Sequence, residues 1–187
     1  MNPRILKIVL MSLLAALITA GAVFSIPMPP PLPPVTLAVF FALVAGLILG
    51  PWWGLGSTAL YLLLGSLGLP VFANGGGGFG YFAGPTGGFL LGYAAAALTA
   101  GLISSQRTWS FIRALSGCLA AVIALYAIGL PWFSFSLAAR SGNPASLAGA
   151  FLIMAPYLVG DVIKAILAAF LLRSLKPLLQ NYFAESR

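Results

Sequence analysis

The chain has almost none of the side chains that metal ions or covalent catalysis use. Its 187 residues include no histidine, one cysteine and two acidic residues. A Cys/His zinc site and a disulfide framework are therefore excluded. A Ser/His relay is also excluded, and an aspartyl dyad would need two carboxylates where only Asp161 lies in an apolar segment. We predict no catalytic residue, no metal site and no cofactor, which leaves an intramembrane enzyme as a remote alternative.

Apolar residues, by contrast, are abundant. They make up 61% of the chain and charged residues only 6%, whereas soluble domains contain roughly 25% charged residues. The apolar segments have the length of membrane-spanning helices, about 20 residues, and not of the roughly 10-residue alternating strands of outer-membrane barrels. The sequence predicts an all-α integral membrane protein, with residues 1–187 forming a single domain in the lipid bilayer.

Six transmembrane helices are expected in the bundle. The second and third are separated only by Gly50 and Pro51, so we expect a tight turn there, with Trp52 and Trp53 at the membrane interface. The expected spans are Ile5 to Phe24, Val35 to Leu49, Trp53 to Leu69, Thr86 to Ile103, Phe111 to Trp132, and Leu147 to Leu172.

The basic residues indicate topology rather than nucleic-acid binding. The net charge is +7, but the cations lie at the ends of apolar segments and not together on one solvated face. If the N-terminus is cytoplasmic, only Arg140 falls outside, which agrees with the positive-inside rule. We therefore expect both termini in the cytoplasm. The inner cations would be Arg4, Lys7, Arg107, Arg113, Arg173, Lys176 and Arg187.

The first span also has features of a signal peptide. Arg4 and Lys7 precede an apolar run and the small residues Ala20-Gly21-Ala22. Cleavage would leave five spans and place the C-terminal cations outside. We therefore favour six spans.

Two outer loops have unusual compositions. Six prolines between Ile26 and Val35 predict a stiff, extended strap, which is either a plain linker or the rim of an outward-facing cavity. The glycine-rich segment Gly68–Gly88 can approach a ligand closely, and we expect a re-entrant loop sheltered by protein. A flexible surface linker is the alternative. A phosphate-binding loop is not indicated, because the Gly-x-x-x-x-Gly-Lys-Ser/Thr pattern is absent.

Asp161 and Lys164 are the two charged residues inside the last span. At a spacing of three they share one face of a helix. A charge at membrane depth costs about 3 kcal/mol or more, so this pair either binds a ligand or only neutralises itself in a structural subunit. Asp161 precedes Arg173 by twelve residues, about 18 Å of helix, which places it in the outer half of the membrane.

Other candidate ligand-binding groups lie in the glycine-rich loop. Thr86 is a candidate N-cap of the fourth span, which would leave the amides of Gly87 and Gly88 at the positive end of the helix dipole. Asn74 would add an amide side chain. We expect these groups and the Asp161/Lys164 face to line one outward-open pocket.

The first span also carries a small-xxx-small pattern, formed by Ala16 and Ala20. Such a groove allows close approach of another helix in lipid. It serves either packing within the bundle or docking of a partner subunit.

The sequence as a whole resembles the BioY family, the biotin-specific substrate-binding subunits (S components) of energy-coupling factor (ECF) transporters. The resemblance covers most of the chain, and the order and spacing of its motifs are specific. Two departures are Ala38, where the family usually has Gln, and Val159, where it commonly has Pro. The motifs are Pro34-Val-Thr-Leu37, Ala45-Gly-Leu-Ile-Leu-Gly-Pro51, Tyr61-Leu-Leu-Leu-Gly-Ser-Leu-Gly-Leu-Pro-Val-Phe-Ala73, Gly84-Pro-Thr-Gly-Gly-Phe-Leu-Leu-Gly-Tyr93, Tyr126-Ala-Ile-Gly-Leu-Pro-Trp132 and Gly160-Asp-Val-Ile-Lys164.

The resemblance implies a biotin-binding subunit in the plasma membrane of a prokaryote. It also implies an ECF transmembrane subunit with ATPase subunits as partners, docked at Ala16 and Ala20. Asp161 and Asn74 are then candidates for the ureido ring of biotin, and Lys164, Gly87 and Gly88 for its carboxylate. An S component for another vitamin and a structural subunit remain alternatives. Candidate aromatic walls, with core packing as the alternative role for most of them, are Tyr81, Phe82, Tyr93, Tyr126 and Trp132.

Overall fold

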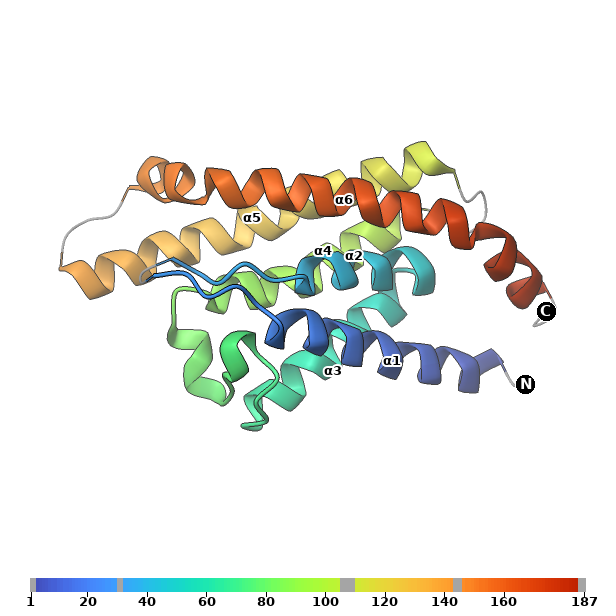
Figure 1. The fold of residues 1–187 in the computed structure, drawn as a ribbon, viewed down its shortest axis with the longest axis horizontal. Coiled ribbons are helices and arrows are strands. Elements are labelled where there is room, and N and C mark those ends of the chain that lie inside the picture. The colour runs from blue at the N-terminus through green and yellow to red at the C-terminus, as the bar shows by residue number, and fades with distance from the viewer. Residues whose placement is uncertain (1–2, 30–31, 105–109, 143–145, 185–187) are drawn as a thin grey trace.

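The computed structural model describes residues 3–29, 32–104, 110–142 and 146–184. Within these residues the chain forms six α-helices and two short 3-10 helices, and the only β-type pairing is one isolated bridge. The expected all-α bundle is confirmed (Figure 1). The elements are α1 (Pro3–Val23), α2 (Ala38–Leu49), α3 (Pro51–Ser66), η1 (Ala73–Gly75), η2 (Phe79–Ala83), α4 (Gly87–Ile103), α5 (Phe111–Ser141) and α6 (Leu147–Ala184).

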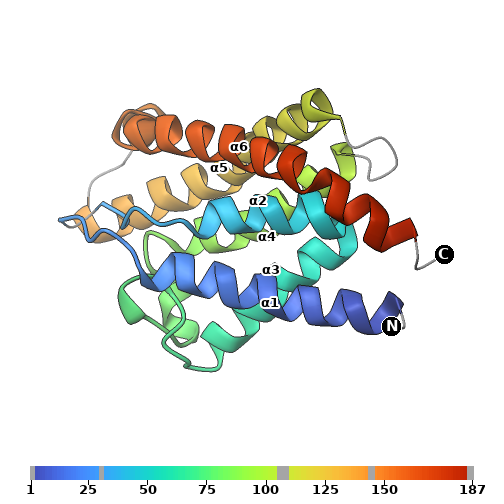
Figure 2. The ribbon, with the colours of Figure 1, turned by 45° about the vertical axis from the view of Figure 1, so that its right-hand side comes forward.

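The helices run roughly along one axis, and the two ends of the chain lie at the same end of the bundle (Figures 1 and 2). The proline-rich and glycine-rich segments lie toward the opposite end. α2 is central, because it packs against α1, α3, α4 and α6. Nine of its twelve residues are buried, as expected for a helix that is apolar on every side.

The tight turn expected at Gly50 and Pro51 is confirmed. Gly50 has φ 80° and ends α2, and Pro51 occupies the first turn of α3. Glycine adopts positive φ without a steric penalty, and proline suits the first turn because its missing N–H would have no partner there. α4 passes close to this turn, since a Cβ on Gly101 would lie 2.6 Å from the carbonyl carbon of Gly50.

The six helices differ in length. α1, α5 and α6 contain apolar stretches long enough to cross a membrane. α2 has only 12 residues, about 18 Å of helix, whereas a bilayer core is about 30 Å thick. The strap and the glycine-rich loop continue the bundle beyond the short helices α2, α3 and α4, at the end opposite to the two chain ends (Figure 1).

The predicted C-terminal ends of the fifth and sixth helices were wrong, because both helices continue past their apolar segments. α5 extends to Ser141 rather than Trp132, with Pro131 inside it. It ends where Gly142 adopts φ 68° and its N–H bonds to the carbonyl of Ala138, a common helix termination. α6 extends to Ala184 rather than Leu172, so polar residues continue both helices beyond the hydrophobic segments.

The strap doubles back, instead of running as one extended segment. Ile26 and Val35 form an antiparallel bridge, with N–H to carbonyl distances of 2.9 and 3.0 Å. Neither residue is a proline, so both amides can donate. The Tyr157 hydroxyl of α6 donates to the carbonyl of Pro33 at 2.8 Å, which fixes the returning limb. Pro30 and Pro31 lie outside the described residues.

The glycine-rich loop folds around one buried aromatic side chain. The ring of Phe72 is fully buried and packs against Tyr61 of α3, Tyr81 and Phe82, with ring centroids 5.4, 5.0 and 5.7 Å away. Gly65 makes this possible, because a Cβ there would collide with the Phe72 ring. The alternative of a flexible linker is therefore not favoured.

We predict that Phe72→Ala lowers the free energy of unfolding by about 3 to 5 kcal/mol, because it leaves a cavity where a fully buried ring had packed. Thermal unfolding of the purified protein in detergent measures the change. Phe79→Ala is the matched control, since Phe79 belongs to the same loop but is 80% exposed. Equal destabilisation by both variants would contradict this view of the loop.

Candidate ligand-binding site

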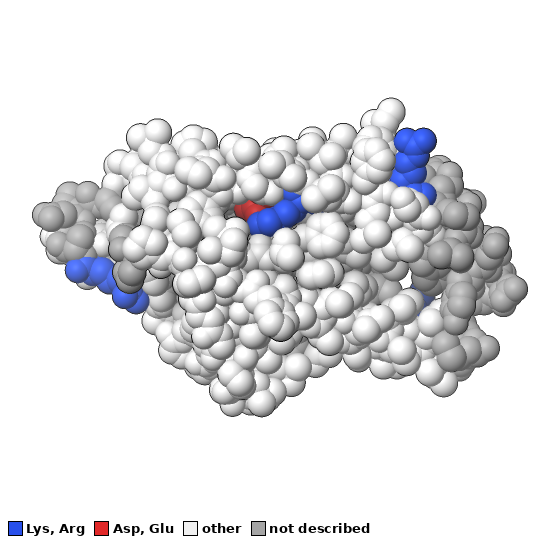
Figure 3. Space-filling model, in the orientation of Figure 1, with Lys and Arg blue, Asp and Glu red and all other residues white. Residues whose placement is uncertain are grey.

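A cavity lies between the strap, the glycine-rich loop and helices α1 to α6. Its walls are mostly apolar, and its polar side chains come from different elements. In Figure 3 an acidic and a basic side chain meet in a hollow in the middle of one face, with the acidic group recessed. The polar lining side chains are Thr36, Tyr61, Tyr81, Thr86, Tyr93, Tyr126, Tyr157, Asp161 and Lys164.

Asp161 is the centre of the polar wall. One carboxylate oxygen accepts a hydrogen bond from the Lys164 amino group at 2.9 Å. The other accepts from the Tyr126 hydroxyl of α5, also at 2.9 Å. The Asp161 and Lys164 side chains are only 10% and 14% exposed. Since each carboxylate oxygen has two lone pairs, Asp161 can still accept hydrogen bonds from a ligand.

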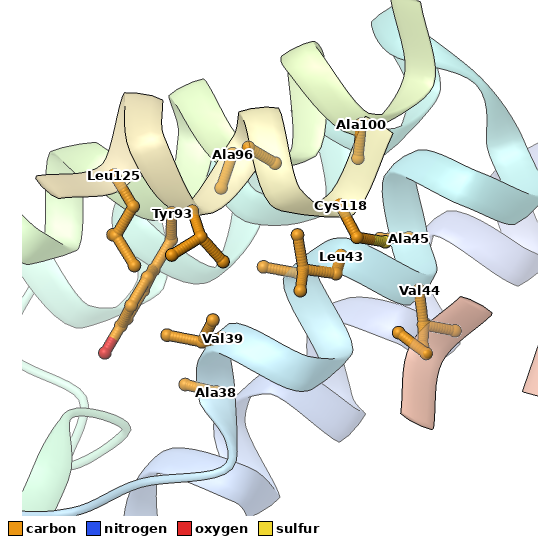
Figure 4. Packing of buried hydrophobic residues seen from close by; sticks show 14 of the residues in the cluster. Ala38, Val39, Leu43, Val44, Ala45, Tyr93, Ala96, Ala100, Cys118 and Leu125 are labelled. Atoms are coloured by element: carbon orange, nitrogen blue, oxygen red, sulfur yellow. The ribbon is translucent and has the colours of Figure 1, made fainter. Parts of the chain in front are cut away.

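Tyr93 and Thr36 form a second polar group. The two hydroxyl oxygens are 3.4 Å apart, and either can donate. Tyr93 projects from α4 at the end of a cluster of buried apolar residues, and Figure 4 shows its ring beside Leu125 with the hydroxyl directed away from Ala100 and Cys118. The Tyr93 hydroxyl therefore lies at the end of the buried cluster that borders the cavity.

Thr86 lines the cavity, but not in the expected way. It precedes α4, yet its side chain makes no capping hydrogen bond. Its backbone is already helical, at φ −85° and ψ −10°, whereas N-caps are typically extended. Thr86 thus occupies the expected N-cap position of α4, but its side chain does not cap the helix.

Asn74, Gly87 and Gly88 are not among the residues that line the cavity. Asn74 is exposed with φ 57°, and its side-chain oxygen accepts from the Ser25 hydroxyl at 3.0 Å. The Gly87 amide donates to the carbonyl of Gly84 at 3.1 Å. Gly88 is buried against Trp132 of α5. These three residues therefore lie outside the described wall of the cavity.

The candidate aromatic residues also divide into those that line the cavity and those that pack elsewhere. Tyr81, Tyr93 and Tyr126 line the cavity. Phe82 packs against Phe72 instead, and Trp132 donates its indole N–H to the carbonyl of Gly84 at 3.0 Å. Sequence reasoning missed Tyr61 and Tyr157 as lining residues, although Tyr61 begins one of the motifs that carry the resemblance.

The two departures from the family pattern differ in environment. Ala38 begins α2 and is fully buried, while Val159 is 62% exposed on α6.

The small-xxx-small face of α1 is only partly covered. Ala16 is exposed and Ala20 is half-buried. The Ala16 end of the small-xxx-small face is therefore not covered by the described parts of the bundle.

A family model described as the BioY family matches residues 1–181. The chain belongs to the BioY family. It is 37% identical to the biotin transporter BioY of Rhodobacter capsulatus, over 90% of this chain and 92% of that protein. It is 36% identical to the probable biotin transporter BioY of Pyrococcus horikoshii (91% and 96%) and 37% identical to the biotin transporter BioY of Thermotoga maritima (87% and 91%).

The fold of this BioY-family chain is similar to that of a solved protein. The crystal structure of the S component for biotin from an ECF-type ABC transporter superposes with a TM-score of 0.79. The two chains are 28% identical, and the match covers 95% of each. Together with the apolar helices, this similarity makes the protein a multi-pass membrane protein of the S-component fold.

We predict that Asp161→Asn and Lys164→Met each lower the free energy of unfolding by about 3 kcal/mol, because each leaves the other charge buried without its partner. The Asp161→Asn/Lys164→Met double variant should be destabilised less than either single variant, since it removes both charges. Unfolding in detergent without ligand measures all three. Destabilisation of the double variant by the sum of the single effects would contradict a mutually compensating pair.

Proposed function

We propose that this protein is the biotin-binding subunit of a vitamin uptake transporter. The observation that carries the proposal is the placement of Asp161, Lys164 and Tyr126 in the wall of an otherwise apolar cavity. The family and the names of its relatives support it, because those relatives are biotin transporters. The chain binds and delivers its ligand and does not catalyse a reaction.

The chemistry of the cavity suits biotin. The ureido ring carries N–H donors and a carbonyl acceptor, the carboxylate favours a cation, and the ring sulfur and valeryl chain favour apolar walls. Asp161 supplies an acceptor, and Lys164 supplies a donor beside it. Apolar contacts would come from Phe89, Leu90 and Met154, which line the same cavity.

The rim residues complete the proposed site. Thr86 and Tyr93 line the cavity and would contact the ligand directly. Asn74 is exposed and would act at its opening, and the Gly87 and Gly88 amides would contribute from the start of α4, next to Thr86. The strap would cover the site, because Tyr157 ties Pro33 to α6 beside Asp161. Biotin would arrive from the outer end of the bundle, with both termini in the cytoplasm of a prokaryotic cell.

Energy for uptake would come from partner subunits. The sequence has no Gly-x-x-x-x-Gly-Lys-Ser/Thr motif for ATP binding. An ECF transmembrane subunit with its ATPase subunits would supply this activity. The exposed Ala16 and the half-buried Ala20 on α1 would allow close approach of a helix of that partner.

The proposal is tested by equilibrium binding of radiolabelled biotin to the purified chain. We expect binding that is weakened about 10- to 100-fold by Asp161→Asn, since hydrogen bonds to a charged group contribute about 1.5 to 3 kcal/mol. Arg173→Gln is the control, because Arg173 is an exposed cation of the same helix. Absence of biotin binding to the wild-type chain, or displacement only by another vitamin, would overturn the proposal.

The docking role of α1 is tested by Ala16→Trp. We expect biotin binding to be retained, because Ala16 is exposed and does not line the cavity, while uptake into cells that carry the partner subunits falls at least tenfold. Leu152→Trp serves as the control, since Leu152 is 73% exposed on α6. Normal uptake by Ala16→Trp, or equal losses in both variants, would show that this face of α1 does not dock.

A further inference from the structure

One buried polar atom in the cavity wall is not satisfied by the protein. Across the part of the chain that the structure describes, the Tyr61 hydroxyl oxygen is the only buried side-chain oxygen or nitrogen without a hydrogen-bond partner. Tyr61 is fully buried on α3 and lines the cavity. Leaving such a group unpaired is unfavourable, because its bonds to water are lost without replacement.

The other tyrosines that line the cavity are different. The Tyr126 hydroxyl donates to Asp161, and the Tyr157 hydroxyl donates to the Pro33 carbonyl. The Tyr81 hydroxyl donates to the Ala73 carbonyl at 3.3 Å, and Tyr93 pairs with Thr36. Four of the five hydroxyl groups therefore already have protein partners, and that of Tyr61 has none.

The position of the Tyr61 ring is fixed by packing. It meets the Phe72 ring edge to face, with centroids 5.4 Å apart and an interplanar angle of 73°. Tyr61 belongs to α3, whereas Asp161 and Lys164 belong to α6, and all three residues line the cavity. Tyr61 therefore contributes to the cavity wall from a different helix than the ion pair does.

We propose that the Tyr61 hydroxyl is a second polar anchor of the ligand, donating a hydrogen bond to a ligand oxygen other than the one that Lys164 binds. This inference rests on the proposed function and adds a specificity-determining residue to it. A ligand with polar groups at both ends can form hydrogen bonds with Tyr61 and with the Asp161–Lys164 pair. A ligand with only one polar end leaves a buried protein group without a hydrogen bond. Biotin has an oxygen at each end, in its ureido carbonyl and in its carboxylate.

Tyr61→Phe tests the anchor, because it removes only the hydroxyl. We expect biotin affinity to fall about tenfold, which corresponds to about 1.4 kcal/mol and is typical of one hydrogen bond. The melting temperature without ligand should stay unchanged or rise, since an unpaired buried group has been removed. Tyr157→Phe is the stability control: its hydroxyl already has a protein partner, so its melting temperature should fall.

Two biotin analogues identify the contact. One lacks the carboxylate, and the other carries sulfur in place of the ureido oxygen. The tenfold loss in Tyr61→Phe should disappear with one of them, because that analogue has already lost the accepting oxygen. Persistence of the loss with both analogues would overturn the inference.

The outcomes separate this inference from the proposed function. Unchanged biotin affinity in Tyr61→Phe, or a parallel fall in affinity and unliganded melting temperature, would overturn the Tyr61 anchor. Binding to the wild-type chain with loss in Asp161→Asn would then still support the biotin site. Failure of the wild-type chain to bind biotin would overturn both.

Discussion

The ion pair of Asp161 and Lys164 is the constraint around which the rest of the bundle is arranged. Two opposite charges in an apolar interior must compensate each other, and here the lysine amino group and the Tyr126 hydroxyl each contact one carboxylate oxygen at 2.9 Å. These contacts bring α5 and α6 together at the cavity. Asp161 lines the cavity, so under the proposed function a ligand with N–H donors would bind its remaining lone pairs, and the cost of burial would become a basis for specificity.

The outer segments act on the same cavity from the other side. The Ser25 hydroxyl links the start of the strap to Asn74 of the glycine-rich loop, and Tyr157 links the returning limb to α6. Both segments are irregular backbone, which a membrane protein tolerates where protein or a cavity shelters it. The strap is held by these hydrogen bonds, and the glycine-rich loop is held as well by the packing of Phe72 against Tyr61, Tyr81 and Phe82.

The sequence predicted the helices and the charged pair well, because these follow from local patterns. Apolar length located the spans, Gly50 and Pro51 located the turn, and the rarity of acidic residues singled out Asp161. Tertiary contacts were not accessible in the same way. Asn74 was expected inside the site, but its pairing with Ser25 holds it at the surface. Tyr61 was overlooked because an aromatic residue within an apolar span gives no sign that its hydroxyl lacks a partner.

The most direct test of the central claim is an experimental structure of the purified chain with bound biotin. The account predicts biotin in the cavity between the strap and α6, with a ligand N–H within hydrogen-bond distance of the Asp161 carboxylate. Biotin bound elsewhere would contradict it, as would an Asp161–Lys164 pair that faces lipid or the cytoplasm without touching the ligand.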